Sequence, residues 1–503
     1  MKTLFKPTSY KKGAIWAVSA TLAWKIISFA NALLLALYFG ANRQTDVYFY
    51  VIMLLGFAVA FLQRLNQTVL IPEAMFLTQE NPSKARQFIN MWLYVYAGVG
   101  LVVICLGALF PEKIWHLLSR FQGTILLHDK ELLISGFILF AFQIVTYYLL
   151  CVAEMYKFFK TAWLGVLNAI FPLLFLLLFG RHVGIISMIY GFLAANIVQV
   201  ITLLVLLRTQ LQWNFAFTWV GLRTRTHQNM LTGQTLAILD MVNSLLPIYL
   251  ISGMGAGLIS ALNYCKQFTD STTEVFTARM ANIAKIEMTE QTAQAKLAQA
   301  NQTFLNGSYI LLVLLAPLVV FSSYFAPEIV ALFFKRGHFD AAATHNTVAF
   351  LRPMLFTLLL AVPGYLQNSA IAAGQKIKEW FPYALTSGLI FTGLLMGGIL
   401  YWGSFAYPYL IGAGLVIGFM INAFLFRKHF PFLHYTAPFW QVLRLTLMAG
   451  VALVPTMLLS HHLPASYWIQ ILVCGTVFVM GYVGILWMCK DVEHLREYTR
   501  NGF

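Results

Sequence analysis

Fourteen long apolar runs constrain this chain more than any other feature of its sequence. Each is close to the ~20 residues that an α-helix needs to cross the hydrocarbon of a bilayer. A backbone in lipid must satisfy its own hydrogen bonds, so such runs fold as helices. Because 60% of the residues are hydrophobic and only 10% are charged, we predict an all-α polytopic membrane protein. The expected spans are 14–39, 46–76, 88–110, 131–153, 160–179, 184–207, 229–252, 254–284, 303–326, 347–372, 380–404, 406–426, 438–460 and 466–488.

The formal net charge of +15 raises the question of a nucleic-acid partner. Lys and Arg are, however, concentrated in the loops on the same side of the membrane as the N-terminus. Basic loops of membrane proteins remain in the cytoplasm, so both termini are expected there. Membrane topology therefore explains most of the excess charge, and we expect membrane lipids and no nucleic acid as partners.

The spans group into two halves. We expect an N-terminal six-helix lobe, an amphipathic helical linker on the cytoplasmic leaflet, a C-terminal six-helix lobe, and two extra helices with a cytoplasmic tail; the corresponding ranges are 1–207, 208–228, 229–428 and 429–503. The halves resemble each other weakly, because the first helix of each ends in a Gly/Ala turn, FGANRQTD at 39–46 and SGMGAG at 252–257. Six spans per half make parallel repeats, which build transporters with a site between the lobes.

A polar stripe follows one face of the eighth expected span. Its members are Asn263, Lys266, Asp270, Thr273, Glu274 and Thr277. Charges at this depth cost a few kcal/mol each and normally face a bundle interior or a water-filled cavity. Lys266 and Asp270 are spaced i,i+4 and could instead neutralise each other as a structural pair.

Other ionisable residues within spans are candidates for the same cavity. Lys25 shares a helix face with small and polar residues, and Arg64 shares a face of the second span with Asp46. Several cations would suit an anionic cargo such as a phosphate or pyrophosphate headgroup. On the seventh span, Asp240 and Asn243 could bind Na⁺ or H⁺, or Asp240 could simply hydrogen-bond to neighbouring helices.

Signatures of enzymes are absent from the sequence. There is no Walker loop and no HExxH arrangement, and the five cysteines lack metal-ligand spacing. We therefore expect a transporter with no catalytic residues, no metal site and no cofactor.

Four segments resemble the MurJ/MviN family of lipid II flippases, within the multidrug/oligosaccharidyl-lipid/polysaccharide exporter superfamily. They are FGANRQTDVYF (39–49), Ile71-Pro72, LFFKRGHFDAAAT (332–344) and AIAAGQKIKEWFPY (370–383). The resemblance implies two six-helix lobes around a cationic cavity, with a groove for a lipid tail on the last two helices. It implies a bacterial inner-membrane protein that moves an undecaprenyl-linked lipid by alternating access, driven by a Na⁺ or H⁺ gradient or by the membrane potential. We expect a monomer.

The resemblance also assigns roles to individual positions. Asp46 matches the family's acid after the FGA turn, and Lys25 and Asn31 fall where the family has two first-helix arginines. Lys266 falls on the eighth-helix arginine, whereas Arg64 lies one to two turns beyond the place of the second-helix arginine. The implied cavity residues are thus Lys25, Asn31, Asp46, Arg64, Lys266, Asp270 and Glu274.

The sequence is also compatible with two other cargoes. The protein could carry another lipid-linked polysaccharide unit, for a capsule or exopolysaccharide, or it could be a cation-coupled multidrug exporter of the same superfamily. Lipid II, the peptidoglycan precursor, is the leading candidate, since the span cations suit a pyrophosphate better than they suit a drug cation.

Overall fold

The structure, a computed structural model, describes residues 10–121, 127–221, 224–273, 277–374, 376–463 and 466–489. These residues form helices and connecting turns, with no β-strand among them. The chain divides into two compact units, Met1–Ile259 and Ser260–Phe503. The first unit includes α9, which packs against α2.

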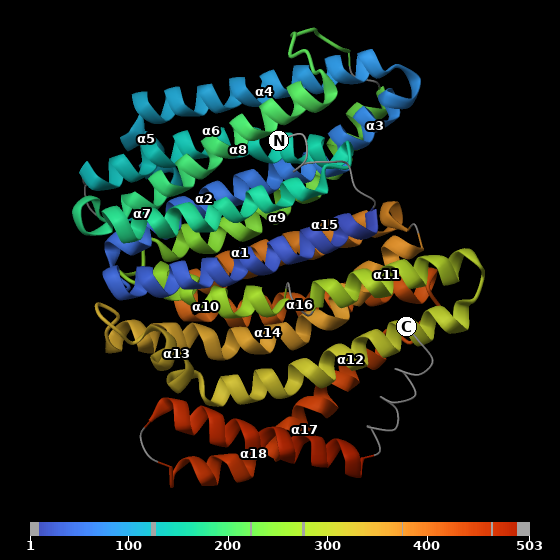
Figure 1. The fold of residues 1–503 in the computed structure, drawn as a ribbon. Helices are drawn as coiled ribbons and strands as arrows, with labels where there is room; N and C mark the ends of the chain where they lie inside the picture. Colours follow the sequence, from blue (N-terminus) through green and yellow to red (C-terminus); the bar gives the residue numbers. More distant parts are fainter. Residues whose placement is uncertain are drawn as a thin grey trace. The chain divides into compact units, whose positions relative to one another are not determined.

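The helices of the first unit follow one another with short connections. They are α1 (Tyr10–Phe39), α2 (Arg43–Leu65), a π-helical turn (Asn66–Leu70), α3 (Ile71–Glu80), α4 (Pro82–Leu109), α5 (Pro111–Leu118), α6 (Leu127–Met155), a 3₁₀ segment (Phe159–Val166), α7 (Leu167–Val183), α8 (Ile186–Leu211) and α9 (Thr224–Ile251). Within this unit α4, α6 and α8 lie side by side, and α7 packs against α8 (Figure 1).

The second unit has a similar order of long and short helices. They are α10 (Leu258–Thr272), which begins two residues before the unit boundary, α11 (Ala278–Ala293), α12 (Leu297–Tyr324), α13 (Ala326–Phe334), α14 (Ala341–Ala373), α15 (Ile377–Trp402), a 3₁₀ turn (Ser404–Ala406), α16 (Tyr407–His429), α17 (Ala437–Ser460) and α18 (Tyr467–Met488). The last two, α17 and α18, pack together, with α17 also against α12 (Figure 1).

Thirteen helical stretches within the described residues are long and apolar enough to cross a membrane. They correspond to all of the expected spans except 254–284. That segment contains α10, which carries Asn263, Lys266 and Asp270 of the polar stripe, and α11. Both helices are shorter than a membrane span requires. The all-helical, polytopic architecture predicted from the apolar runs is therefore confirmed.

The packing order inside the two units supports an internal repeat. In the first unit α4 packs on α6, α6 on α8, and α2 on α6. In the second, α12 packs on α14, α14 on α16, and α11 on α14. The short helices α5 and α13 occupy corresponding places, and each has a Pro-Glu pair in its first turn, Pro111-Glu112 and Pro327-Glu328. This pair is a repeat signal that sequence analysis overlooked.

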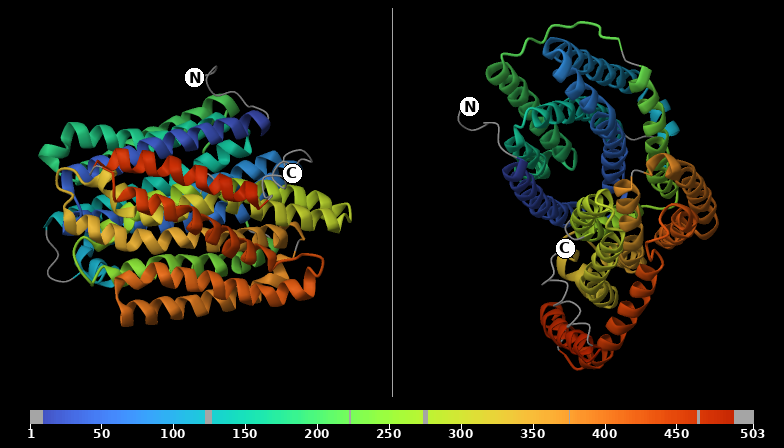
Figure 2. Two further views of the ribbon diagram at one scale, coloured as in Figure 1. Left: turned by 90° about the horizontal axis from the view of Figure 1, so that it is seen from below. Right: turned by 90° about the vertical axis from the view of Figure 1, so that its right-hand side faces the viewer.

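The expected amphipathic helix over 208–228 is wrong for its central part. Helix α8 ends at Leu211, Gln212 adopts a left-handed conformation, and residues 212–221 are extended and non-helical. This segment crosses the upper edge of the unit as a green strap in the right-hand view of Figure 2. The Trp213 indole and several backbone carbonyls of this segment bond to α4, whereas Phe217 and Trp219 are 56% and 74% exposed.

Asn90 on α4 is the main attachment point of this strap. Its Nδ2 donates to the carbonyl oxygens of Asn214 at 2.7 Å and Ala216 at 2.9 Å, and its Oδ1 accepts from Trp213 Nε1 at 2.7 Å. The Trp213 side chain is buried, and the Arg86 guanidinium lies 5.6 Å from its ring centroid. One amide thus satisfies three groups of a non-helical segment, as buried backbone requires.

We expect Asn90→Ala to lower the thermal unfolding midpoint by several degrees. The substitution leaves the buried indole N–H of Trp213 and two strap carbonyls without their partners, and each such loss costs about 1–3 kcal/mol. Thermal unfolding of the purified protein in detergent measures the effect. Thr209→Ala is the control, because the Thr209 hydroxyl is exposed and bonds only within α8. Equal midpoints for Asn90→Ala and wild type would show that the strap is not held by this amide.

Candidate functional site

The turn before α2 is built to present an acid at the first turn of that helix. Gly40 has a φ of 68°, in the left-handed region that glycine tolerates best. Asn42 then caps α2 through a capping box, in which its side chain accepts from the Thr45 N–H and the Thr45 hydroxyl accepts from the Asn42 N–H. Asp46 follows in the first turn of α2, where the helix dipole favours a negative charge.

Asp46 connects this turn to the loop between α9 and α10. Its side chain is buried, and its Oδ2 accepts a hydrogen bond from the Gly257 backbone N–H at 2.5 Å. Gly257 has a φ of 83°, and a Cβ at this position would lie 2.8 Å from the Ala41 carbonyl oxygen. The two Gly/Ala turns that the sequence showed as weak repeats are therefore in direct contact, and only glycine suits position 257.

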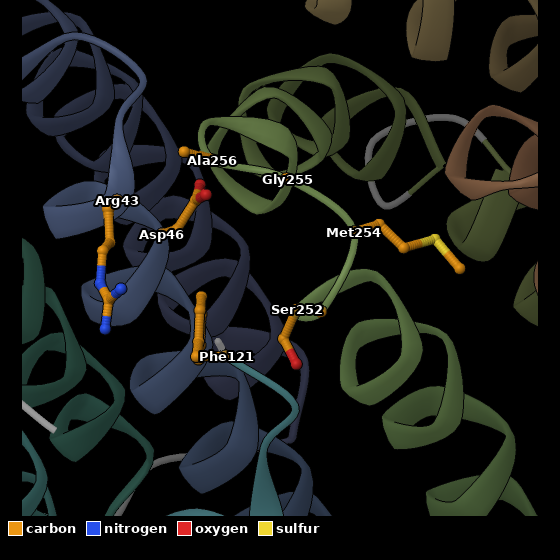
Figure 3. A pocket seen from close by; sticks show the side chains of 8 residues that line it. Arg43, Asp46, Phe121, Ser252, Met254, Gly255 and Ala256 are labelled. Carbon is orange, nitrogen blue, oxygen red and sulfur yellow. The ribbon is translucent and has the colours of Figure 1, made fainter. Parts of the chain in front are cut away.

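A cavity of about 170 Å³ lies beside this contact. It is lined by Arg43, Asp46, Phe121, Ser252, Gly253, Met254, Gly255 and Ala256. Figure 3 shows Asp46 pointing from α2 toward the loop that carries Gly255 and Ala256. The Arg43 Nη2 is 3.5 Å from the buried Asp129 carboxylate, and Ser252 Oγ accepts from the Arg120 N–H at 2.9 Å. Charged and polar groups thus fix both walls of the cavity.

Arg64, an expected cavity residue, forms an ion pair with Asp240, the acid of the expected ion site, within the first unit. Arg64 Nη1 on α2 contacts Asp240 Oδ2 on α9. The side chains are 45% and 65% exposed, although both lie within candidate membrane spans. Exposed charges at this depth are costly in lipid, so the pair indicates a water-filled space.

The groups that contact the Asp240 carboxylate are relevant to the Na⁺ or H⁺ site expected at this residue. Its carboxylate has a cationic partner in Arg64. The nearby Ser244 hydroxyl donates to the Asp240 backbone oxygen at 2.8 Å rather than to the carboxylate. The structure therefore places an arginine against the acid.

Lys25 and Asn31 occupy different environments on α1. Lys25 is half-buried, with its Nζ 5.0 Å from the centroid of the Trp24 ring. Asn31 is buried, and its Nδ2 donates to the Ala169 carbonyl oxygen on α7 at 2.8 Å. Asn31 thus joins two helices, whereas the Lys25 ammonium lies in a site that favours a cation.

In the second unit, α10 separates an apolar face from the polar stripe. Tyr264 and Cys265 are fully buried, with the Tyr264 ring packed against Phe334 and Phe339 of the α13 region. On the other face, Lys266 is half-buried with its Nζ 6.0 Å from the Tyr407 ring centroid, and Asp270 is exposed. Glu274, the remaining acid of the stripe, lies outside the described residues.

An apolar cavity is present on the last two helices. Its volume is about 530 Å³. It is lined by Trp440, Leu443, Arg444, Leu447, Met448, Val451 and Ile485. One cation among otherwise apolar side chains is a composition that suits a lipid chain ending in a charged group.

Arg43, Ser252 and Gly257 belong to the site but are not among the residues predicted from the sequence. The similarity of the two Gly/Ala turns was the available signal for Gly257, because matched turns in repeats can meet across a pseudo-symmetric arrangement. Nothing in the sequence pairs Arg64 with Asp240, since they are 176 residues apart.

Comparisons with known proteins give one family. The family model described as lipid II flippase MurJ matches residues 35–485. The probable lipid II flippase MurJ of Borreliella burgdorferi is 21% identical over 405 residues, which cover 78% of this chain and 79% of that protein.

Solved structures show a shared fold. A lipid II flippase MurJ in an inward closed conformation matches with a TM-score of 0.79 at 18% identity, covering 95% of this chain and 99% of that one. An inward-facing multidrug resistance transporter of the MATE family matches with a TM-score of 0.65 at 11% identity, covering 82% and 98%. Because the family model spans most of the sequence and the fold agrees with it, the chain belongs to the MurJ family of lipid II flippases.

Proposed function

We propose that this protein moves lipid II from the inner to the outer leaflet of the bacterial inner membrane by alternating access. The observation that carries the proposal is the family match over residues 35–485. The charged groups that the chain places within membrane spans support it, because a pyrophosphate-linked saccharide cannot cross hydrocarbon without a polar path.

In this proposal the headgroup is bound by cations that lie on the helices of the expected spans. Lys25, Arg64 and Lys266 are the candidates. Lysine supplies a point charge and arginine a planar fork, and both bind phosphate oxygens. Asp270 and Glu274 would complete the polar surface toward the saccharide, and Asn31 would hold α1 against α7 behind it.

The undecaprenyl tail is proposed to remain outside this path, on α17 and α18. The apolar cavity of about 530 Å³ on these helices supports the assignment. Arg444 lines it and could meet a phosphate at the end of the tail. Residues 429–503 would then be the tail-binding addition to two six-helix lobes.

The contact between Asp46 and Gly257 is proposed to act as a gate. It joins the start of α2 to the loop at which the chain passes from its first unit toward its second. One charge-assisted hydrogen bond is worth about 1.5–3 kcal/mol, which is strong enough to favour a closed state and weak enough to break in each cycle.

Topology, energy source and oligomeric state complete the proposal. The basic loops favour cytoplasmic termini. A Na⁺ or H⁺ gradient or the membrane potential would drive transport, since the potential supplies about 2.3 kcal/mol per charge per 100 mV. The protein would act as a monomer, with lipid II and membrane lipids as its partners.

Depletion of the protein in its own host tests the function. We expect lipid II to accumulate in the inner leaflet and the cells to lyse, which leaflet-resolved analysis of polyprenyl-linked lipids would show. Accumulation of a different lipid-linked glycan would keep the transport mechanism and overturn lipid II as the cargo. Absence of any accumulating intermediate would contradict the flippase proposal.

Lys266→Ala is expected to reduce transport at least about tenfold while folded protein is retained. The substitution removes a cation from the polar face of α10 and leaves the buried Tyr264 face intact. Complementation of the depleted strain, with membrane protein levels measured in parallel, checks it. Lys285→Ala is the control, because Lys285 is exposed on α11. Full complementation by Lys266→Ala would sink the cationic headgroup site.

Gly257→Ala is expected to impair transport strongly. A Cβ would lie 2.8 Å from the Ala41 carbonyl oxygen, and the φ of 83° is strained for any residue with a side chain, by about 1–3 kcal/mol. The loop would shift and lose its bond to Asp46. Gly56→Ala serves as the control, because a Cβ there has no neighbour within 4 Å. Complementation assays would refute the gate if Gly257→Ala and Gly56→Ala behaved alike.

A further inference from the structure

The ion pair between Arg64 and Asp240 is not needed to hold its two helices together. It joins α2 to α9, yet the two side chains are 45% and 65% exposed. Helices α2 and α9 also pack directly against each other, so their association does not depend on it. Two paired side chains that are this exposed are accessible to a ligand.

The strength of the pair allows exchange with a ligand. Exposed ion pairs contribute little to stability, because water screens the charges and the side chains lose entropy. A pyrophosphate carries more negative charge than one carboxylate and presents several oxygens to the donors of a guanidinium. It can therefore displace a carboxylate from an exposed arginine.

The groups around Asp240 favour its release as well. The Ser244 hydroxyl donates to the Asp240 backbone oxygen, so it does not bind the carboxylate. The acid lies on α9 and the arginine on α2. A change of side-chain rotamer is therefore enough to separate the carboxylate from the guanidinium, and neither helix has to move.

We infer that Asp240 is an internal counter-ion that occupies Arg64 when no lipid-linked substrate is bound. The pyrophosphate of the substrate displaces Asp240 on binding, and Asp240 returns to Arg64 when the substrate leaves. Asp240 thereby lowers the affinity for substrate and assists its release. This inference rests on the proposed function, and it makes Asp240 a residue that tunes affinity through Arg64.

Binding of lipid II to the full-length protein in lipid nanodiscs tests the exchange. Asp240→Asn is expected to tighten the dissociation constant about threefold to tenfold, since it removes the competing carboxylate. Arg64→Gln is expected to weaken binding about tenfold or more. In the Arg64→Gln background, Asp240→Asn should change nothing, because the acid then has no guanidinium to occupy.

Glu112→Gln is the matched control. Glu112 on α5 pairs with Lys130 at 2.5 Å, and its side chain is 61% exposed, close to the value for Asp240. Its removal should leave the dissociation constant unchanged. Thermal unfolding and size-exclusion profiles verify the folding of each variant. If Asp240→Asn does not fold, Asp240→Ser replaces it, and if Arg64→Gln does not fold, Arg64→Met replaces it.

Several outcomes would overturn the inference. Weaker or unchanged binding by Asp240→Asn would exclude a competing counter-ion. Equal tightening with and without Arg64 would show that Asp240 repels the headgroup directly. If lipid II binds neither the wild type nor any variant, the proposed function itself fails. If lipid II binds all of them with the same dissociation constant, only the counter-ion inference fails.

Discussion

The cost of a charge in hydrocarbon is the constraint on which the functional features of this protein depend. Apolar residues can face either lipid or a neighbouring helix, but charged residues need water, a partner or a ligand. Helix α10 shows the consequence, with Tyr264 and Cys265 buried on one face and Lys266 and Asp270 on the other. Arg64 and Asp240 meet the same constraint by pairing in an open site. The charges are therefore confined to positions that have a partner or an open surface.

Backbone conformation provides a second level of organisation. Gly40 and Gly257 both have positive φ values, which lets two short turns approach closely. The capping box of Asn42 and Thr45 sets the start of α2, and this fixes Asp46 one residue further on. A local rule for starting a helix thus places an acid where a distant backbone N–H can bind it.

The two units use one packing plan for different purposes. Their corresponding helices pack in the same order, and both contain a short helix with a Pro-Glu pair in its first turn. The charges do not follow this repeat, since the first unit has Arg64 paired with Asp240 whereas the second has Lys266 beside an aromatic ring. The packing of the helices is thus repeated in the two units, whereas the charged residues of the candidate site are not.

The sequence by itself determined the helices and the class of protein. Apolar runs of membrane-spanning length have few structures open to them, because every backbone group must be bonded within the helix. The polar stripe of α10 was likewise readable, since helical periodicity is local. Tertiary structure alone decided that residues 212–221 form an extended strap, because their partner Asn90 lies on α4 and an amphipathic pattern does not specify helix or strand. It also decided that Asp240 meets Arg64 and that Asp46 meets Gly257. Such contacts join residues far apart in the chain, and their energies depend on which helices pack together rather than on local sequence.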